Sequence, residues 1–307
     1  MPQATREIKR RIRSIKNTRQ ITRAMELVSA AKMRRAVANV LATRTYAELG
    51  WQLLQELSQR TTQARHQLLV KREEIKKLGL VIISSNRGLC GGFNYQLSHR
   101  AGKYIQQQAL GQEIGLIAVG KRGRDIMARA GHTLAAEFAK PDITTKIEEV
   151  RPLAKLIMDD YLGGKYDRVV VAYTDFISAV SQKPRLKQIL PLEQESDSLL
   201  GQAGSPLARI ASSESRVAPF NYEYKFEPTP DIVLEDLLPR LIEVQIYQAW
   251  LESDAAEHSA RMLAMRNASE AAKDMIDSLT LSFNQARQAS ITAELADITG
   301  GRAAIGG

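Results

Sequence analysis

The chain has 307 residues, of which 44% are hydrophobic and 25% are charged. This composition excludes a disordered chain and allows one large domain or two smaller ones. No apolar run approaches the ~20 residues that span a bilayer, and no apolar segment of a secretory signal follows the basic N-terminus. Cys90 is the single cysteine, which excludes an intramolecular disulfide and fits a reducing compartment such as a bacterial cytoplasm.

The excess positive charge is concentrated at the N-terminus. The first 35 residues carry eleven lysines and arginines against two glutamates, a net charge of +9 that equals the net charge of the whole chain. The rest of the sequence is therefore neutral. This asymmetry predicts an anionic partner for the N-terminal segment, and nucleic acid is one candidate.

Residues 1–60 form the first predicted segment, a long helix from about residue 4. It has no proline after Pro2 and no glycine before Gly50, and its composition favours helix. Apolar residues recur at steps of three and four and make one stripe. They include Ile8, Ile12, Ile15, Ile21, Met25 and Val28. A helix of ~55 residues would reach roughly 80 Å, and a helix with a narrow apolar stripe needs a partner.

Residues 61–230 have a different pattern and predict a central, Rossmann-like α/β domain with a parallel sheet. Short runs rich in Val and Ile alternate with helical segments, which is the order of parallel strands joined by helices. The expected strands are 77–85, 114–120 and 166–174, with a further edge strand at 184–190. The expected helices are 93–108, 121–130 and 148–163. Residues 193–219 are rich in Ser, Gly, Pro and acidic residues and predict an exposed loop.

Residues 231–307 predict a second long helix, with its end at about residue 299 and a frayed glycine-rich tail. Asp231 is a candidate N-cap, and Pro239 should kink the helix or mark its first turn. Fifteen positions from Leu241 to Ser290 follow alternating steps of three and four, and eleven of them are apolar. A seven-residue repeat over about seven heptads indicates a left-handed coiled coil. We expect the two terminal helices to wind around each other, antiparallel.

Two glycine-bearing turns and the histidines are the remaining candidates for chemistry. The turn "SSNRGLCGGFN" (84–94) follows a strand and opens a helix, as phosphate-binding loops do, but its glycines fit neither nucleotide-binding pattern. A tight strand-to-helix turn is the competing interpretation, and it applies equally to "GKRGRD" (120–125). The four histidines show no metal-ligand spacing. The sequence predicts no catalytic site, no metal and no cofactor.

Three long motifs carry a resemblance to a known family. They are "IKNTRQITRAMELVSAAKMRRA" (15–36), "SSNRGLCGGFN" (84–94) and "ARMLAMRNAS…FNQARQASITAELADI" (260–298). In order and spacing they resemble the gamma subunit of the rotary, F-type ATP synthase of bacteria. Nucleic-acid binding and a nucleotide-dependent enzyme stand beside this resemblance as alternatives from the residues alone.

The resemblance implies a mechanical function. The chain would be the central rotor shaft, which couples ion-driven rotation of the membrane c ring to ATP synthesis or hydrolysis at the beta subunits. It would have no active site of its own. The implied partners are the alpha and beta subunits of the hexamer, the epsilon subunit and the c ring, and not nucleic acid. The implied location is peripheral, on the cytoplasmic face of the bacterial plasma membrane, with the c ring as the only membrane attachment.

The motifs also imply contact residues. Those that resemble beta-subunit contacts are Arg23, Met25, Arg87, Arg261, Arg287, Gln288, Thr292 and Glu294. The stretch "FNYEYKFEP" (220–228) resembles the foot that meets the c ring and the epsilon subunit, and it contains Tyr222, Glu223 and Tyr224.

Overall fold

A computed structural model describes most of the chain and divides it into two compact units. The described residues are 3–60, 67–70, 72, 74–108, 111–144, 146–192 and 229–305. The larger unit is Ser29–Arg261, and the smaller unit combines Met1–Val28 with Met262–Gly307. Two long helices, α1 (Gln3–Arg60) and α6 (Pro230–Ile305), contribute to both units. Within the described ranges, every helix is too short or too polar to cross a bilayer.

The larger unit contains a five-stranded sheet with strand order β3-β2-β1-β4-β5. The strands are β1 (Lys77–Ile83), β2 (Glu113–Val119), β3 (Leu134–Phe138), β4 (Arg168–Phe176) and β5 (Gln182–Leu190). The first four are parallel, and β5 is antiparallel to β4. The predicted parallel sheet and its edge strand are confirmed. β3 was not predicted, because its side chains are mostly exposed and it lacks a run of Val or Ile.

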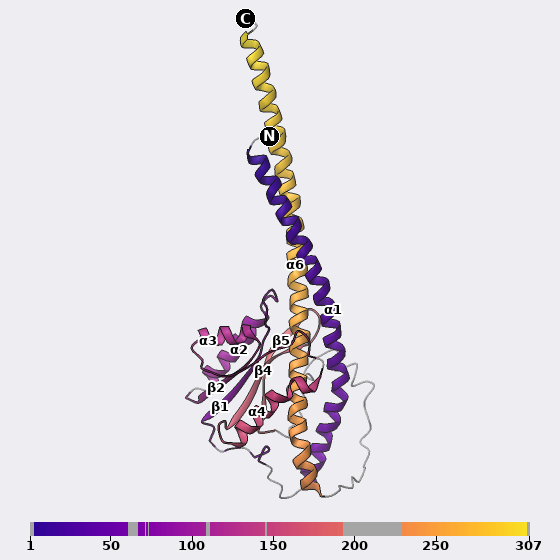
Figure 1. The fold of residues 1–307 in the computed structure, drawn as a ribbon, viewed down its shortest axis with the longest axis vertical. Helices are drawn as coiled ribbons and strands as arrows, with labels where there is room; N and C mark the ends of the chain where they lie inside the picture. The colour runs from indigo at the N-terminus through magenta and orange to yellow at the C-terminus, as the bar shows by residue number, and fades with distance from the viewer. Residues whose placement is uncertain are drawn as a thin grey trace. The chain divides into compact units, whose positions relative to one another are not determined.

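Helices cover both faces of this sheet (Figure 1). On one face lie α2 (Phe93–Gln108) and α3 (Lys121–Arg129), and on the other lies α4 (Arg151–Leu162), preceded by the short 3-10 helix η1 (Ile147–Glu149). Side chains alternate along β1, so that Leu80 and Ile82 face α2 while Val81 and Ile83 face α4. Two apolar cores result, one on each face.

Within the larger unit, α6 is part of the core rather than a helix with one buried seam. Residues 241–259 are all buried except Glu243, which is partly exposed. Trp250, Ile246 and Ala255 belong to the same apolar cluster as strand residues and α1 residues Ala36 and Val40. The heptad pattern predicted burial only at every third or fourth position. Here the helix contacts both the sheet face and α1, so it is buried on nearly all sides.

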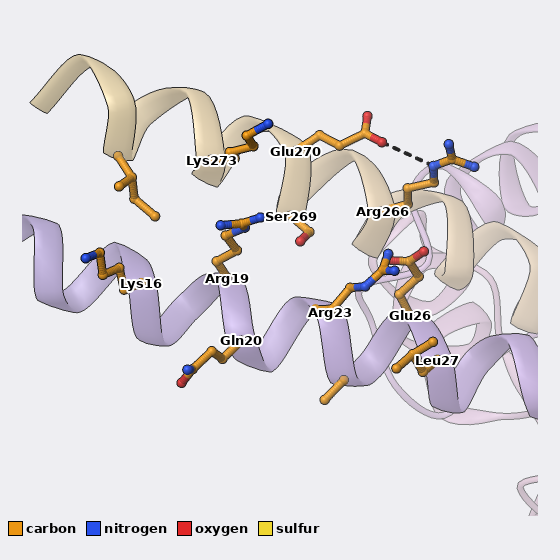
Figure 2. A pocket seen from close by; sticks show the side chains of 12 residues that line it. Lys16, Arg19, Gln20, Arg23, Glu26, Leu27, Arg266, Ser269, Glu270 and Lys273 are labelled. Carbon is orange, nitrogen blue, oxygen red and sulfur yellow. Dashed lines mark hydrogen bonds and ion pairs between the residues drawn. The ribbon is translucent and has the colours of Figure 1, made fainter. Parts of the chain in front are cut away.

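In the smaller unit the two terminal helices lie side by side and antiparallel. Figure 2 shows Lys16 at the same end as Lys273, and Leu27 at the same end as Arg266. The antiparallel pairing was predicted, but the predicted stripe on α1 is only partly correct, because Ile21 and Val28 are 61% and 55% exposed.

The predicted start of α6 is correct within one residue, since the helix begins at Pro230. Thr229 accepts a hydrogen bond from the first turn, so it has the capping role predicted for Asp231, which lies within the helix. Pro239 also lies inside the helix, so it does not mark the first turn, and the helix runs past the predicted end through Gly300 to Ile305.

Candidate functional site

A basic groove of about 820 Å³ lies between the two helices of the smaller unit (Figure 2). Five cations, two carboxylates and five neutral residues line it. Its lining is Lys16, Arg19, Gln20, Arg23, Ala24, Glu26 and Leu27 from α1, and Arg266, Ser269, Glu270, Lys273 and Ile276 from α6. The cations from α1 belong to the basic N-terminal segment, so the groove is a candidate site for an anionic partner.

Ion pairs within the groove neutralise only part of this charge. Arg23 Nη1 lies 2.7 Å from Glu26 Oε2, and Arg266 Nε lies 3.2 Å from Glu270 Oε1. Among the described residues, no carboxylate pairs with Lys16, Arg19 or Lys273. These three cations remain available to a partner. Because the two pairs are exposed on at least one side, each contributes little to stability, about 0–1 kcal/mol.

The predicted contact residues of the smaller unit fall into two places. Arg23 lines the groove, and Met25 is a partly buried neighbour on α1. Arg287, Gln288, Thr292 and Glu294 are all exposed on the last part of α6. In this part of α6, every residue from 291 to 300 is exposed.

The end of α6 also exposes an apolar stripe. Ile291, Leu295 and Ile298 are each about half exposed or more and are spaced by four and three residues, so they lie on one face of the helix. A helix with an exposed apolar stripe of this kind normally packs against a partner. The stripe lies within the same segment as the four predicted contact residues.

In the larger unit, the predicted residues Arg87 and Arg261 lie together. Arg87 is exposed on the turn after β1, whereas Arg261 is only 9% exposed. Arg261 Nη2 donates to the backbone carbonyls of Arg87 and Gly88 at 3.4 Å and pairs with Glu257 Oε1 at 2.9 Å. The Arg261 guanidinium is thus engaged within this chain, and its contact with a beta subunit stays a prediction.

The same contacts bear on the glycine-rich turn at 84–94. Its Arg87 and Gly88 carbonyls face a cation, Arg261. A phosphate-binding loop presents backbone N–H groups instead. The arrangement favours the structural strand-to-helix turn over the phosphate loop. Within the described part of the chain, no group of three His, Cys, Asp or Glu residues is placed to hold a metal.

A buried charge cluster beside this turn was missed by the sequence analysis. Lys140 Nζ lies 2.9 Å from Asp254 Oδ1 and 2.6 Å from Glu257 Oε2, and all three side chains are buried. Burial alone would lower the pKa of Lys140, but the two carboxylates outweigh it and raise the pKa above its usual value. The sequence offers no clear local signal for this cluster, because Asp254 and Glu257 lie in a stretch of α6 that contains other polar residues such as Gln248 and Glu252.

Some predicted positions lie outside the described residues. These are the candidate foot residues Tyr222, Glu223 and Tyr224 and the predicted loop at 193–219.

Comparison with known proteins adds a match over nearly the whole chain. A family model described as ATP synthase matches residues 4–305. The ATP synthase gamma chain of Chloroflexus aurantiacus is 44% identical over 98% of this chain and 99% of its own length. The gamma chain of Roseiflexus sp. is 40% identical over 98% of both chains. The chain belongs to the ATP synthase gamma family. The resemblance carried by the three motifs is confirmed.

Solved structures agree with the gamma-family fold. A chain of the Euglena gracilis mitochondrial ATP synthase, in a structure of OSCP, F1 and the c-ring, has a TM-score of 0.66 at 19% identity, covering 98% of this chain and 94% of that chain. A second Euglena gracilis structure, titled as the rotor, has a TM-score of 0.61 at 18% identity, covering 94% and 99%. At these identities the comparison supports the fold, with two terminal helices and a central sheet.

Proposed function

We propose that this gamma-family chain is the central rotor shaft of an F-type ATP synthase. It couples ion-driven rotation of the membrane c ring to ATP synthesis or hydrolysis at the beta subunits. The observation that carries the proposal is the match to ATP synthase gamma chains over 98% of this chain and 99% of the relative. A structure titled as the rotor of an ATP synthase has the same fold.

The proposed mechanism is coupling through asymmetric contacts. The shaft presents different side chains in different directions, so it contacts three otherwise identical beta subunits differently at any moment. A contact that favours one conformation of a subunit shifts that subunit's equilibrium, and with it the affinity for nucleotide. Rotation of the c ring would pass each beta subunit through the same series of contacts in turn.

The basic groove supports an acidic protein partner. Lys16, Arg19 and Lys273 are its unpaired cations, and we propose that acidic loops of the beta subunits meet this surface, with Arg23 and Met25 at the contact. Rotation requires contacts that break and form again. Exposed ion pairs of about 0–1 kcal/mol each suit this requirement better than a dry apolar interlock.

The end of α6 supports a second contact with the hexamer. We propose that Arg287, Gln288, Thr292 and Glu294 contact beta subunits there. The exposed stripe of Ile291, Leu295 and Ile298 favours the same placement, because an apolar helix face is stabilised by a protein surface around it. Arg87 is proposed as a further beta contact, supported by its exposure on the turn after β1.

The remaining parts of the proposal concern the other subunits and the membrane. We propose that Tyr222, Glu223 and Tyr224 meet the c ring and the epsilon subunit, and that segments 1–60, 61–230 and 231–307 act as N-terminal helix, central domain and C-terminal helix. The complex would lie at the cytoplasmic face of the bacterial plasma membrane, with this chain attached only through the c ring. The chain would have no active site of its own and would not bind nucleic acid.

Reconstitution with alpha and beta subunits tests this proposal. The expected result is a stoichiometric complex with more ATPase activity than the alpha and beta subunits have without this chain. If no such complex forms and the activity does not change, the rotor proposal is wrong. Calorimetry of the isolated chain with ATP tests the enzyme alternative, which requires nucleotide binding by this chain alone.

A further inference from the structure

A closed chain of polar contacts surrounds the turn at 86–90 in the larger unit. Asn86 Nδ2 donates to the Lys140 backbone carbonyl at 2.6 Å. The Lys140 ammonium pairs with Glu257 at 2.6 Å, and Glu257 pairs with Arg261 at 2.9 Å. Arg261 then donates back to the carbonyls of Arg87 and Gly88. The first part of the turn is therefore held at Asn86 by the backbone of Lys140, and at Arg87 and Gly88 by Arg261.

This ion-pair chain lies in surroundings that make its members depend on one another. Lys140 and Glu257 are buried, and Arg261 nearly so. Burial alone would raise the pKa of Glu257, but the charges of Lys140 and Arg261 outweigh it and lower that pKa. Lys140 and Glu257 thus stabilise each other's charged forms. Removing Lys140 would leave the buried Asp254 without its ion-pair partner, which is strongly unfavourable.

The turn that this chain holds has an unusual conformation. Leu89 has a φ of 63° and its side chain is 62% exposed. The left-handed region is unfavourable for a non-glycine residue, and such residues are concentrated at functional sites. An exposed leucine in this conformation contributes little to the core of its own chain. Beside it, the Arg87 side chain is also exposed.

We propose that the buried chain Lys140–Glu257–Arg261 is a positioning device that fixes the turn 86–90, so that Leu89 and Arg87 are presented preorganised to a beta subunit. Leu89 is the apolar anchor of this contact, and Arg87 its charged neighbour. The partner surface is an apolar pocket flanked by a carboxylate. Preorganisation matters here because a turn that is already ordered loses less conformational entropy on each contact. The inference rests on the proposed function, since it takes the beta subunit as the partner.

Cys90 provides a native reporter for the turn. It is the only cysteine, is 2% exposed and accepts a hydrogen bond from Asn94 Nδ2 at 3.2 Å. A thiol reagent therefore reaches it only when the turn opens. The rate of reaction of the purified full chain with a maleimide or an aromatic disulfide measures that opening.

Three variants test the positioning device by this rate. Arg261→Gln removes the guanidinium donors to the turn, and Lys140→Met removes the central charge. Asn86→Ala removes two hydrogen bonds of a partly exposed side chain, one to the Lys140 carbonyl and one from the Lys121 backbone N–H. We expect Arg261→Gln and Lys140→Met to label at least about tenfold faster, a change of about 1.4 kcal/mol in the opening equilibrium, and Asn86→Ala to label faster by less. Asn86→Ala and Arg261→Gln keep the test decisive if Lys140→Met does not fold, as judged by circular dichroism.

The direction of the change in labelling rate distinguishes opening of the turn from a change in the pKa of the Cys90 thiol. Burial raises the pKa of Cys90, while the positive charge of Arg261 opposes this rise. Loss of Arg261 would therefore raise the pKa further and slow the reaction if the turn stayed closed. Arg266→Gln is the matched control, because it makes the same change in an exposed pair of α6 and should leave the rate unchanged. Wild-type labelling rates in folded Arg261→Gln and Asn86→Ala would overturn the proposal.

The docking part is tested in the reconstituted complex. Leu89→Ala should weaken assembly with alpha and beta subunits or lower ATP-driven proton pumping severalfold, whereas Val180→Ala, at an equally exposed apolar position elsewhere in the unit, should not. If the wild-type chain fails to assemble, the proposed function fails. If it assembles and pumps but Leu89→Ala behaves as wild type, only this inference is wrong.

Discussion

At the scale of single residues, Asp167 joins three segments of the larger unit. Its carboxylate accepts hydrogen bonds from Arg72 Nη1 at 2.7 Å and from the backbone N–H groups of Lys76 and Lys77 at 3.0 and 2.8 Å. Burial alone would raise the pKa of Asp167, but these hydrogen bonds outweigh it and hold the pKa below its usual value. The start of β1 is thereby tied to the start of β4.

We expect Asp167→Asn to weaken the larger unit in a pH-dependent way. A carboxylate with a lowered pKa stabilises the fold above its unfolded pKa, and this contribution is lost as the pH falls through the folded value. The variant should lose about 1–3 kcal/mol at pH 7 and show a smaller further loss between pH 5 and pH 2 than the wild type. Urea unfolding across this range measures both. The exposed carboxylate of Asp159 supplies the control, as Asp159→Asn should have little effect.

Met25 is the residue whose substitution should affect coupling most selectively. It lies next to the exposed pair of Arg23 and Glu26 and is partly buried. Met25→Lys adds a cation to a surface that is proposed to slide past acidic loops. The new ion pairs should stabilise some rotor angles more than others. We expect ATP-driven proton pumping to fall severalfold while the yield of assembled complex stays near wild type. Met25→Leu should do neither, and unchanged pumping in Met25→Lys would count against the prediction.

The sequence motifs led to residues on α6 that are exposed in the structure, but nothing in the sequence predicted that Arg261 and Lys140 are buried. The contact residues proposed at the end of α6 come from the motif that contains them, and the structure shows that they are exposed. The burial of Arg261 depends on the turn at 86–90, more than 170 residues away in sequence, and no local pattern encodes that contact. For the same reason Lys140 was missed: its two acidic partners lie on α6, and only the fold brings them together.

At the scale of elements, periodicity predicted the helices and most strands correctly. Periodicity gave the wrong burial pattern where a helix packs against several elements, and it missed a strand whose side chains are mostly exposed. Residues 241–259 of α6 contact several elements, so burial there is nearly continuous and a heptad pattern understates it. β3 has the opposite property, since most of its side chains remain exposed and its sequence lacks an apolar signal. Gly300 did not end α6, because glycine weakens a helix by only about 1 kcal/mol.

Leu279→Pro tests the role of α6 as a continuous helix. Leu279 lies in the smaller unit, in the helix interior, where proline removes a backbone hydrogen bond and clashes with the preceding turn, at a cost of about 3 kcal/mol or more. We expect no stoichiometric complex with alpha and beta subunits. Leu279→Met keeps the helix and should assemble normally. A normal yield of complex from Leu279→Pro would refute the need for an unbroken helix.

At the scale of the whole molecule, different segments of the chain have different charges and different proposed contacts. The first 35 residues have a net charge of +9, while the remaining residues, taken together, have no net charge. In the proposed rotor, the basic helix and its partner meet the hexamer, and the rest of the chain connects to the c ring. The account therefore requires that this chain turns as one body relative to the alpha and beta subunits.

Observation of rotation in single complexes tests that claim most directly. Cys90→Ser with Lys103→Cys places one exposed thiol on α2 for a bead or gold particle, while the alpha and beta subunits are fixed to a surface. On addition of ATP and magnesium, we predict continuous rotation in one direction, with three pauses per turn, one for each beta subunit. Complexes that hydrolyse ATP while the labelled chain stays still, or moves without a preferred direction, would contradict the account.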